Sequence, residues 1–443
     1  MSDVAANGSL RAPLTLAADA TRAAAASYVE HRLANGLRVL LHEDHSTPMV
    51  TINVLYHVGS KNEQRGRTGF AHLFEHLMFD GSRNVLRGGY DLHCTSVGGD
   101  NNAFTNLDIT DYYISLPSEQ LALGLWLESD RMAEFAIQEI SLETQKNVVL
   151  EEKRQTSDDA PYGDVTQVMA ELAFDERHPY SWDTIGRAED IVAATMDDVR
   201  AFYERFYVPS NATLVIGGDF DVDEAMRLIA GYFGPIPAGA AIERPRREAS
   251  LHHYGQRRRI ESAIVPFDAV FLAYHSPALD DPDFHALELL VTILADGESS
   301  RFYRALEYEQ EIASETECFV EEGELGSLLY VYAIGQTAEI TPEQLQASLM
   351  AEIAKVVDEG ITERELMKAK NRKMTSVVSA LQSVSTRTER LAWYSAIFDD
   401  PALAFHEADL YEPVTVDDVR RVARRWLTAE PNVVEYVAVR DHQ

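Results

Sequence analysis

Two imidazoles and a carboxylate lie within the five residues His72, Leu73, Phe74, Glu75 and His76. Residues four apart on a helix lie one turn above one another on the same face, so His72 and His76 can reach one ion. Imidazole nitrogens are common ligands of Zn²⁺. Glu75 lies on the same side, outside the ligand positions, where it can accept a proton from a water molecule. The order HxxEH therefore predicts a metal centre with a general base beside it.

The residues around this motif are apolar, which predicts a helix over residues 68–79 that is buried on several sides. Burying three ionisable groups in an apolar segment is expensive unless something compensates their desolvation. A bound metal ion supplies that compensation. The apolar surroundings therefore favour metal binding over a solvated pair of histidines.

A catalytic zinc site needs a third protein ligand and one open position. The helix predicted over residues 138–157 offers Glu143, Glu151 and Glu152. Periodicity favours Glu152, which follows Val148 by four residues and Val149 by three, on the face that these apolar residues are expected to bury. Glu151 is expected to be solvated, but periodicity alone leaves it open as the ligand.

An internal repeat divides the chain. Thr195–Arg200 (TMDDVR) recurs as Thr415–Arg420 (TVDDVR), and Phe79–Gly81 matches Ala295–Gly297 at a similar offset. Two matches at nearly one offset indicate duplicated halves. We expect an N-terminal extension at 1–27, a zinc-bearing domain at 28–240, a basic linker at 241–258 that lies against the chain's own carboxylates, and a homologous domain at 259–443.

The second half is expected to lack a metal site. The match of Phe79–Gly81 with Ala295–Gly297 aligns the two halves. In this alignment His72, Glu75 and His76 correspond to three residues of the second half that do not form a metal motif, Glu288, Val291 and Thr292.

Hydrophobic periodicity predicts strands before helices within each half. It indicates a hairpin over 29–43, strands over 50–58 and 111–116, and helices over 68–79, 118–134 and 138–157. This order favours an α+β fold of two homologous halves, each an antiparallel-rich sheet with helices on one face.

Composition excludes several classes of function. The 443 residues include 39 basic and 72 acidic side chains, a net charge of −33, which argues against nucleic-acid binding. No apolar run is long enough to span a membrane. Cys94 and Cys318 are expected to be buried, reduced thiols. We expect a cytoplasmic protein, or a periplasmic one if a signal peptide has been removed.

The motif and its surroundings resemble a known family. His72–His76 followed by Met78–Ser82 is similar to the zinc helix of the pitrilysin-type inverzincins, and the chain is closest in length to their mitochondrial processing peptidase branch and its bacterial relatives. A segment like Val148–Arg154 carries the family's third ligand, and its spacing selects Glu152. Other matches, which extend the resemblance over most of residues 28–237, are Gly98–Thr105, His178–Tyr180, Ile185–Gly186 and Phe206–Asn211.

The resemblance implies a zinc endopeptidase that cleaves peptides or unfolded segments within a closed chamber. Zn²⁺ would be held by His72, His76 and Glu152, with Glu75 as the general base. The alternative is a non-catalytic scaffold or peptide-binding core subunit of the same fold, and the intact HxxEH motif favours the enzyme.

The resemblance also implies how substrate is held. The strand around Asn102, Ala103 and Phe104 would pair with an extended peptide by β-augmentation, which makes main-chain hydrogen bonds whatever the peptide's sequence.

One feature of the family is missing. Members that act alone carry an Arg and a Tyr, seven residues apart, in the second half, but the expected positions here hold Glu307 and Ser314. Arg301 and Tyr308 have the same spacing and lie too early to align. We therefore expect a heterodimer whose homologous partner subunit supplies the pair. The alternative is a homodimer that uses Arg301 and Tyr308.

Overall fold

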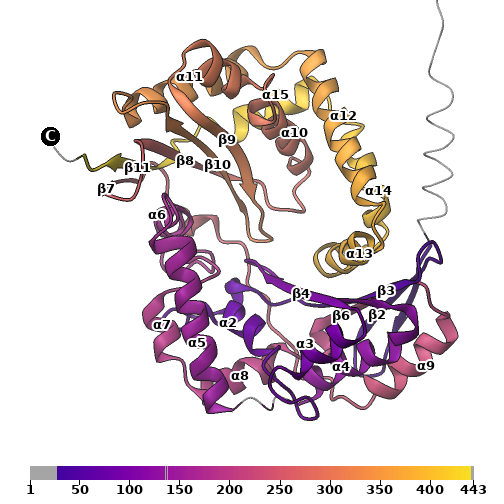
Figure 1. Cartoon of the computed structure of the whole chain (residues 1–443). Coiled ribbons are helices and arrows are strands. Elements are labelled where there is room, and N and C mark those ends of the chain that lie inside the picture. Colours follow the sequence, from indigo (N-terminus) through magenta and orange to yellow (C-terminus); the bar gives the residue numbers. More distant parts are fainter. Residues whose placement is uncertain (1–26, 135, 137, 441–443) are drawn as a thin grey trace, which may run out of the picture.

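The computed structural model describes residues 27–440 apart from residues 135 and 137. The chain forms two halves, each built around its own sheet. Figure 1 shows the first half in indigo and magenta and the second in orange and yellow. The expected extension at 1–27 lies outside the described residues except for Ser27.

The first half contains a six-stranded sheet in the order β1-β2-β6-β3-β5-β4. Its pairings are antiparallel except for β2 with β6. The strands are β1 (Val29–Arg32), β2 (Arg38–Glu43), β3 (Met49–Tyr56), β4 (Asp100–Thr105), β5 (Thr110–Pro117) and β6 (Ala212–Gly218). The helices are α2 (Phe70–Leu77), α3 (Gly89–Ser96), α4 (Leu121–Ala133), α5 (Glu139–Lys153), α6 (Val165–Ala173), α7 (Ala188–Ala193), α8 (Met196–Phe206) and α9 (Val222–Tyr232).

The second half repeats this plan with five strands in the order β7-β11-β8-β10-β9. Again one pairing, β7 with β11, is parallel and the others are antiparallel. The strands are β7 (Arg257–Ser262), β8 (Ala269–Ser276), β9 (Ala313–Glu321), β10 (Ser327–Gly335) and β11 (Asn432–Ala438). The helices are α10 (Phe284–Ala295), α11 (Pro342–Glu359), α12 (Glu363–Ala380), α13 (Val384–Phe398), α14 (Leu403–Tyr411) and α15 (Val416–Trp426). The α+β fold of two homologous halves is thus confirmed.

The repeated hexapeptide marks the same structural event in both halves. Thr195 caps α8 and accepts a hydrogen bond from the Asp198 backbone N–H, while Thr415 caps α15 and accepts one from Asp418. In each case the Asp carboxylate accepts a hydrogen bond from the Thr backbone N–H, which completes a capping box. The sequence repeat therefore reports a helix start that both halves need.

Each sheet receives a helix from the other half on its second face. Helix α13 of the second half packs against β6 and β3 of the first sheet, and α6 of the first half packs against β11 and β8 of the second. Leu40 and Val215 of the first sheet share one apolar cluster with Leu391 of α13. The prediction of helices on one face of each sheet is therefore incomplete, because the second face of each sheet is covered by a helix of the other half.

The basic segment between the halves lies against carboxylates, as expected. Arg247 pairs with Asp280, and Arg258 pairs with Glu171 at 3.1 Å. The last two residues of the expected linker, Arg257 and Arg258, already belong to β7.

Two further expectations can be compared with the structure. Cys94 and Cys318 are both free and buried, as the sequence predicted. Among the described helices, none combines the length and the apolar character that a membrane span requires.

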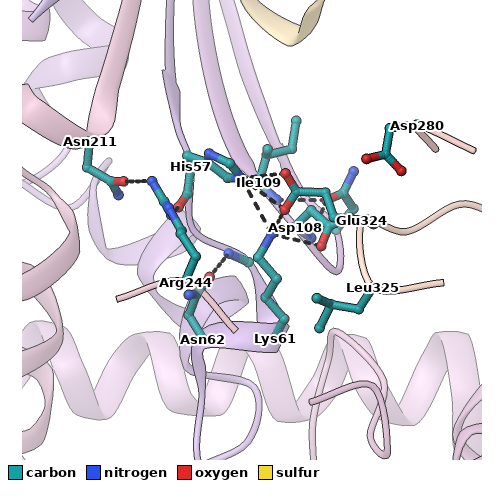
Figure 2. Close-up of polar contacts among 12 residues, drawn as sticks. His57, Lys61, Asn62, Asp108, Ile109, Asn211, Arg244, Asp280, Glu324 and Leu325 are labelled. Atoms are coloured by element: carbon teal, nitrogen blue, oxygen red, sulfur yellow. Dashed lines mark hydrogen bonds and ion pairs between the residues drawn. The ribbon is translucent and has the colours of Figure 1, made fainter. Parts of the chain in front are cut away.

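A buried ion network joins the two halves. Lys61 Nζ lies 2.9 Å from Asp108 Oδ1 and also bonds Glu324 of the second half (Figure 2). The Glu324 backbone N–H donates to Asp108 Oδ2, and His57 lies 2.9 Å from the Glu324 carboxylate. The Lys61 side chain is only 1% exposed, so its charge is compensated almost entirely by these carboxylates.

Replacing Lys61 with Met is expected to lower the free energy of unfolding by about 3–5 kcal/mol, because it leaves Asp108 and Glu324 without their cation. Urea denaturation measures this difference. Arg65→Met is the matched control: Arg65 pairs with Glu176 on the surface, and its loss should cost less than about 1 kcal/mol. Equal, small losses in both variants would contradict the network's role.

The stability cost of Lys61→Met is expected to depend on pH. Burial would raise the pKa of Glu324, but the hydrogen bond with His57 and the charge of Lys61 outweigh it and lower the pKa from 4.5 to about 2. A carboxyl with a lowered pKa stabilises the folded state above its unfolded-state pKa and loses that contribution as pH falls through the folded-state value. The cost of Lys61→Met should therefore shrink between pH 4.5 and pH 2.

Candidate metal centre

Helix α2, which carries the HxxEH motif, is held by close backbone packing at its first turn. Gly69 adopts a left-handed conformation (φ 80°), and a Cβ there would lie 2.5 Å from the Ile185 carbonyl oxygen. A Cβ on Gly186 would lie 2.3 Å from the Gly69 nitrogen. The Ile185–Gly186 segment noted in the sequence therefore allows a second loop to contact the start of the helix.

A carboxylate that the sequence reasoning missed satisfies the first backbone donors of α2. Glu63 accepts hydrogen bonds from the N–H groups of Gly69 at 2.9 Å and Ala71 at 2.7 Å. These donors have no partner within the helix, so the bonds fix where the helix begins. The available signal was an acidic residue shortly before a helix that has no Ser, Thr, Asp or Asn at its N-cap.

The apolar face of α2 fixes its rotation. Leu73, Phe74 and Leu77 are fully buried in the core of the first half. With these residues turned inward, His72 and His76 lie on the face toward α5. The structure thus contains the predicted buried helix, over residues 70–77.

Three predicted side chains converge at one point. His72 Nε2 lies 3.6 Å from Glu152 Oε1, and His76 Nε2 lies 3.3 Å from Glu152 Oε2. One potential ligand atom from each residue lies within 4.8 Å of the others. Within the described ranges, this is the one group of three or more His, Cys, Asp and Glu residues with such geometry.

The structure separates Glu152 from its neighbours on α5. Glu151 points away and pairs with Arg154 at 2.6 Å, and this hydrogen bond lowers the pKa of the exposed Glu151 carboxyl to about 2. Glu143 pairs with Lys146 at 2.7 Å. The expectation that Val148 is buried is wrong, because it lies on the outer side of the helix and is 43% exposed. Val149 is the residue that faces the core, and Glu152 follows it by three positions.

The charge states of His72 and Glu152 suit a cation. Burial and the neighbouring His76 lower the pKa of the His72 imidazole to about 4. The hydrogen bond with His76 lowers the pKa of the Glu152 carboxyl. At neutral pH the set therefore presents a neutral His72 imidazole and an ionised carboxylate, the forms in which these groups bind metal ions. Two imidazoles and one carboxylate fit a zinc site with one open position.

Glu75 connects this centre to the edge of the sheet. Its carboxylate accepts a hydrogen bond from Thr105 Oγ1 of β4 at 2.7 Å. Burial raises the pKa of Glu75, and the Thr105 bond opposes part of that rise. A carboxylate with a raised pKa beside a metal centre suits proton transfer.

Strand β4 is one of the two edges of the first sheet, since among the described residues it pairs with β5 alone. It contains all three residues that the resemblance assigned to substrate binding: Asn102, Ala103 and Phe104. Thr105 and Ala103 face the side of α2, and Phe104 packs on the opposite face with α13. An unpaired strand edge next to the candidate metal centre is a template for a further strand.

The corresponding position of the second half holds an ion pair. Helices α10 and α12 pack together there as α2 and α5 do in the first half. Glu288, which stands at the position of His72, pairs with Lys373 of α12 at 2.7 Å and accepts a hydrogen bond from Tyr411. Cation and anion thus meet where the first half gathers its three candidate ligands.

Arg301 and Tyr308 do not come together as a pair. The Arg301 guanidinium bonds Glu365 at 2.8 Å and the Gly360 carbonyl at 3.0 Å, which ties it to the start of α12. The Tyr308 side chain is 72% exposed. Glu307 accepts a hydrogen bond from Thr316, so it too is engaged locally.

Comparisons with known proteins match both halves of the chain. The family model described as Insulinase (Peptidase family M16) matches residues 38–178, and the model described as Peptidase M16 inactive domain matches residues 193–373. The zinc protease PqqE of Helicobacter pylori is 29% identical over 398 residues, which cover 89% of each protein.

Solved structures with the same fold include two bacterial proteases. The crystal structure of a protease from Helicobacter pylori has a TM-score of 0.86 and 27% identity, and the match covers 93% of this chain and 99% of that chain. The periplasmic protease PqqL from Escherichia coli has a TM-score of 0.74 and 21% identity over 93% of this chain but 48% of its own. With a family model matching each half in the expected order, the chain belongs to peptidase family M16, the pitrilysin-type family.

Proposed function

We propose that the chain is a zinc-dependent endopeptidase subunit that cleaves peptides or unfolded segments within a closed chamber. The convergence of His72, His76 and Glu152, with Glu75 hydrogen-bonded to the neighbouring strand edge, carries this proposal. Relatives named zinc proteases support it. The rival role, a non-catalytic scaffold or peptide-binding core subunit, would not need this arrangement.

His72, His76 and Glu152 would hold Zn²⁺, which when bound lowers the pKa of a water molecule and polarises the scissile carbonyl. Glu75 takes the proton from the attacking water and delivers it to the leaving amine. Thr105 orients the Glu75 carboxylate through its 2.7 Å hydrogen bond.

The free edge of β4 would hold the peptide backbone. Asn102, Ala103 and Phe104 provide the main-chain groups that pair with an extended substrate beside the ligand set. Main-chain pairing accepts many sequences but only extended chains, so the substrates are peptides or unfolded segments rather than folded domains.

Glu75→Gln is expected to lower kcat by about 10²–10⁴-fold while the bound zinc is unchanged, because the amide keeps the shape of the side chain but cannot take a proton. Hydrolysis of a quenched fluorescent peptide measures the rate, and elemental analysis of the same sample measures zinc. Retained turnover would remove Glu75 from its role. A zinc-loaded, assembled parent enzyme that cleaves no peptide would favour the scaffold.

We also propose that a homologous partner subunit supplies the Arg/Tyr pair in a heterodimer. The attachment of Arg301 to Glu365 and Gly360 supports this, since a guanidinium held there is occupied within its own subunit. The homodimer that uses Arg301 and Tyr308 remains the alternative. The cytoplasm is the proposed location and the periplasm its alternative, because the relative PqqL is described as periplasmic.

Arg301→Ala combined with Tyr308→Phe is therefore expected to leave kcat/KM of the assembled enzyme unchanged, after correction for the fraction of folded protein. The single variant Arg301→Ala separates the structural effect, because loss of its bonds to α12 should lower thermal stability. A fall in kcat of the folded double variant by about 10²–10³-fold, the usual loss when one donor to a developing oxyanion is removed, would instead support the homodimer.

A further inference from the structure

A second cavity lies behind the candidate substrate strand, on the face of the sheet opposite the metal centre. Its volume is about 520 Å³, and it is lined by Phe104 of β4, Asn106 just beyond that strand, and side chains from α10, α13 and α14 of the second half. The two halves therefore build it together, next to the strand edge that would hold a peptide.

The alternation of β4 directs side chains into two different places. Thr105 bonds Glu75 and Ala103 packs on the same side, against the core that contains α2. Phe104 faces α13 and the cavity, and Asn102 bonds Tyr113 on that face. A peptide paired with β4 has the same alternation. Every second side chain of such a peptide would point away from the metal centre and toward α13.

Aromatic rings line much of the cavity. They come from three helices of the second half as well as from β4, and they are Phe104, Phe284, Trp393, Tyr394, Phe398 and Tyr411. Such rings can contact the methylene groups of a long side chain, and their faces attract a cation.

The charges around the same cavity are strongly unequal. Six carboxylates line it, and the one guanidinium, that of Arg390, is paired with Glu407. Glu288 is paired with Lys373. Glu322 and Glu389, by contrast, have neither a hydrogen bond nor an ion pair among the described residues. Asp281 also lacks an ion pair but accepts a hydrogen bond from the Asp283 backbone N–H. Among the described residues, Glu322 and Glu389 are therefore the two lining carboxylates that have no direct partner of either kind.

The pKa values of Glu322 and Glu389 are both raised, as expected for carboxylates without a direct cation partner. Burial raises the pKa of Glu389, and the charge of Arg390 offsets only part of the rise. Desolvation of Glu322 within the cavity, and secondly the charge of Glu288, raise its pKa to about 7 although the side chain keeps contact with solvent. The charge of Lys373 offsets only part of this rise. A cation placed between such carboxylates would favour their ionised forms.

Glu389 also lies near the strand that would carry substrate. It lines the same cavity as Phe104 of β4. Burial, and after it the charge of Glu389, also raise the pKa of Tyr113, which lies opposite Asn102 on β5. The carboxylate is thus close to the face of the sheet toward which alternate side chains would point.

We propose that this cavity binds a lysine or arginine side chain of the peptide paired with β4, and that Glu322 and Glu389 select it. The proposal rests on the proposed peptidase function, because that function supplies the extended peptide. Aromatic walls alone would accept any long apolar side chain. The unpaired carboxylates favour one that ends in a cation, and a basic residue at one alternate position thereby becomes a determinant of specificity.

The test compares peptides that differ in one charge. Fluorescent ten-residue peptides with a single Lys, moved along the sequence, are matched with peptides carrying norleucine at the same position. Zinc-loaded Glu75→Gln protein allows binding to be measured by anisotropy without cleavage. We expect the Lys peptide to bind about ten-fold more tightly at one position or at positions two apart. Arg should replace Lys there.

The variant Glu322→Gln/Glu389→Gln, in the same background, should remove this preference and leave the affinity for the norleucine peptide unchanged. Glu119→Gln/Glu204→Gln is the matched control, since it removes two charges from exposed residues outside the cavity and should keep the preference. Equal binding of Lys and norleucine peptides at every position, or a preference that survives in the cavity variant, would overturn the proposal. So would an equal loss in the control, or no binding of either peptide.

Cleavage by the parent protein distinguishes this proposal from the peptidase function itself. Hydrolysis of Lys and norleucine peptides at equal kcat/KM, with equal affinities, would reject the cavity and keep the peptidase. A Lys preference in binding without hydrolysis by the assembled enzyme would keep the cavity and reject the peptidase.

Discussion

The packing of α2 against α5 is the constraint on which the candidate centre depends. One face of α2 is committed to the core through Leu73, Phe74 and Leu77, so the opposite face has a fixed direction. Helix α5 approaches that face with its own buried residue, Val149, turned inward, and this rotation carries Glu152 to the two imidazoles. A carboxylate and two imidazoles brought together without another cation between them are costly to bury. The apolar packing of the two helices therefore holds a set of groups that gains stability once an ion is bound.

The two homologous halves have similar folds but place different side chains between their corresponding helices. The first half gathers donor atoms between α2 and α5, whereas the second places the Glu288–Lys373 ion pair between α10 and α12. The second half nevertheless completes the structure of the first, because α13 covers one face of the sheet that ends in β4. The ion pair between Lys61 and Glu324 also joins the two halves. A face of the first sheet that its own helices leave uncovered thus becomes a wall of a cavity beside the candidate substrate strand. Retaining both halves is a physical requirement of this arrangement, not only a record of ancestry.

Local patterns in the sequence predicted the parts of the structure that local physics determines. The HxxEH spacing was enough to select His72 and His76, whereas periodicity only favoured Glu152 over Glu151 and the family resemblance was needed to select it. Val148 was assigned to the wrong face because the three consecutive apolar residues of Val148–Leu150 do not define a helix rotation. The repeated hexapeptide was recognisable since a capping box needs Thr and Asp at fixed spacing. Other features depend on contacts between residues far apart in the sequence, such as the packing of α13 on the first sheet and the contact of Lys61 with Glu324. Periodicity says that a face is apolar but not which half will cover it. For that reason the position of Glu389 beside β4 could not be predicted from the sequence.

The most direct test of the account is the zinc content of two neighbouring variants on α5. Glu152→Ala should lower the zinc affinity by more than the roughly 10–100-fold that follows loss of a ligand's hydrogen-bond partner, because it removes a ligand itself. Glu151→Ala, which breaks only the exposed contact with Arg154, should retain one zinc per chain. Elemental mass spectrometry after dialysis against a weak chelator, with circular dichroism to confirm folding, measures both. Full zinc occupancy in folded Glu152→Ala, or its loss in Glu151→Ala, would contradict the assignment of His72, His76 and Glu152 as the ligands.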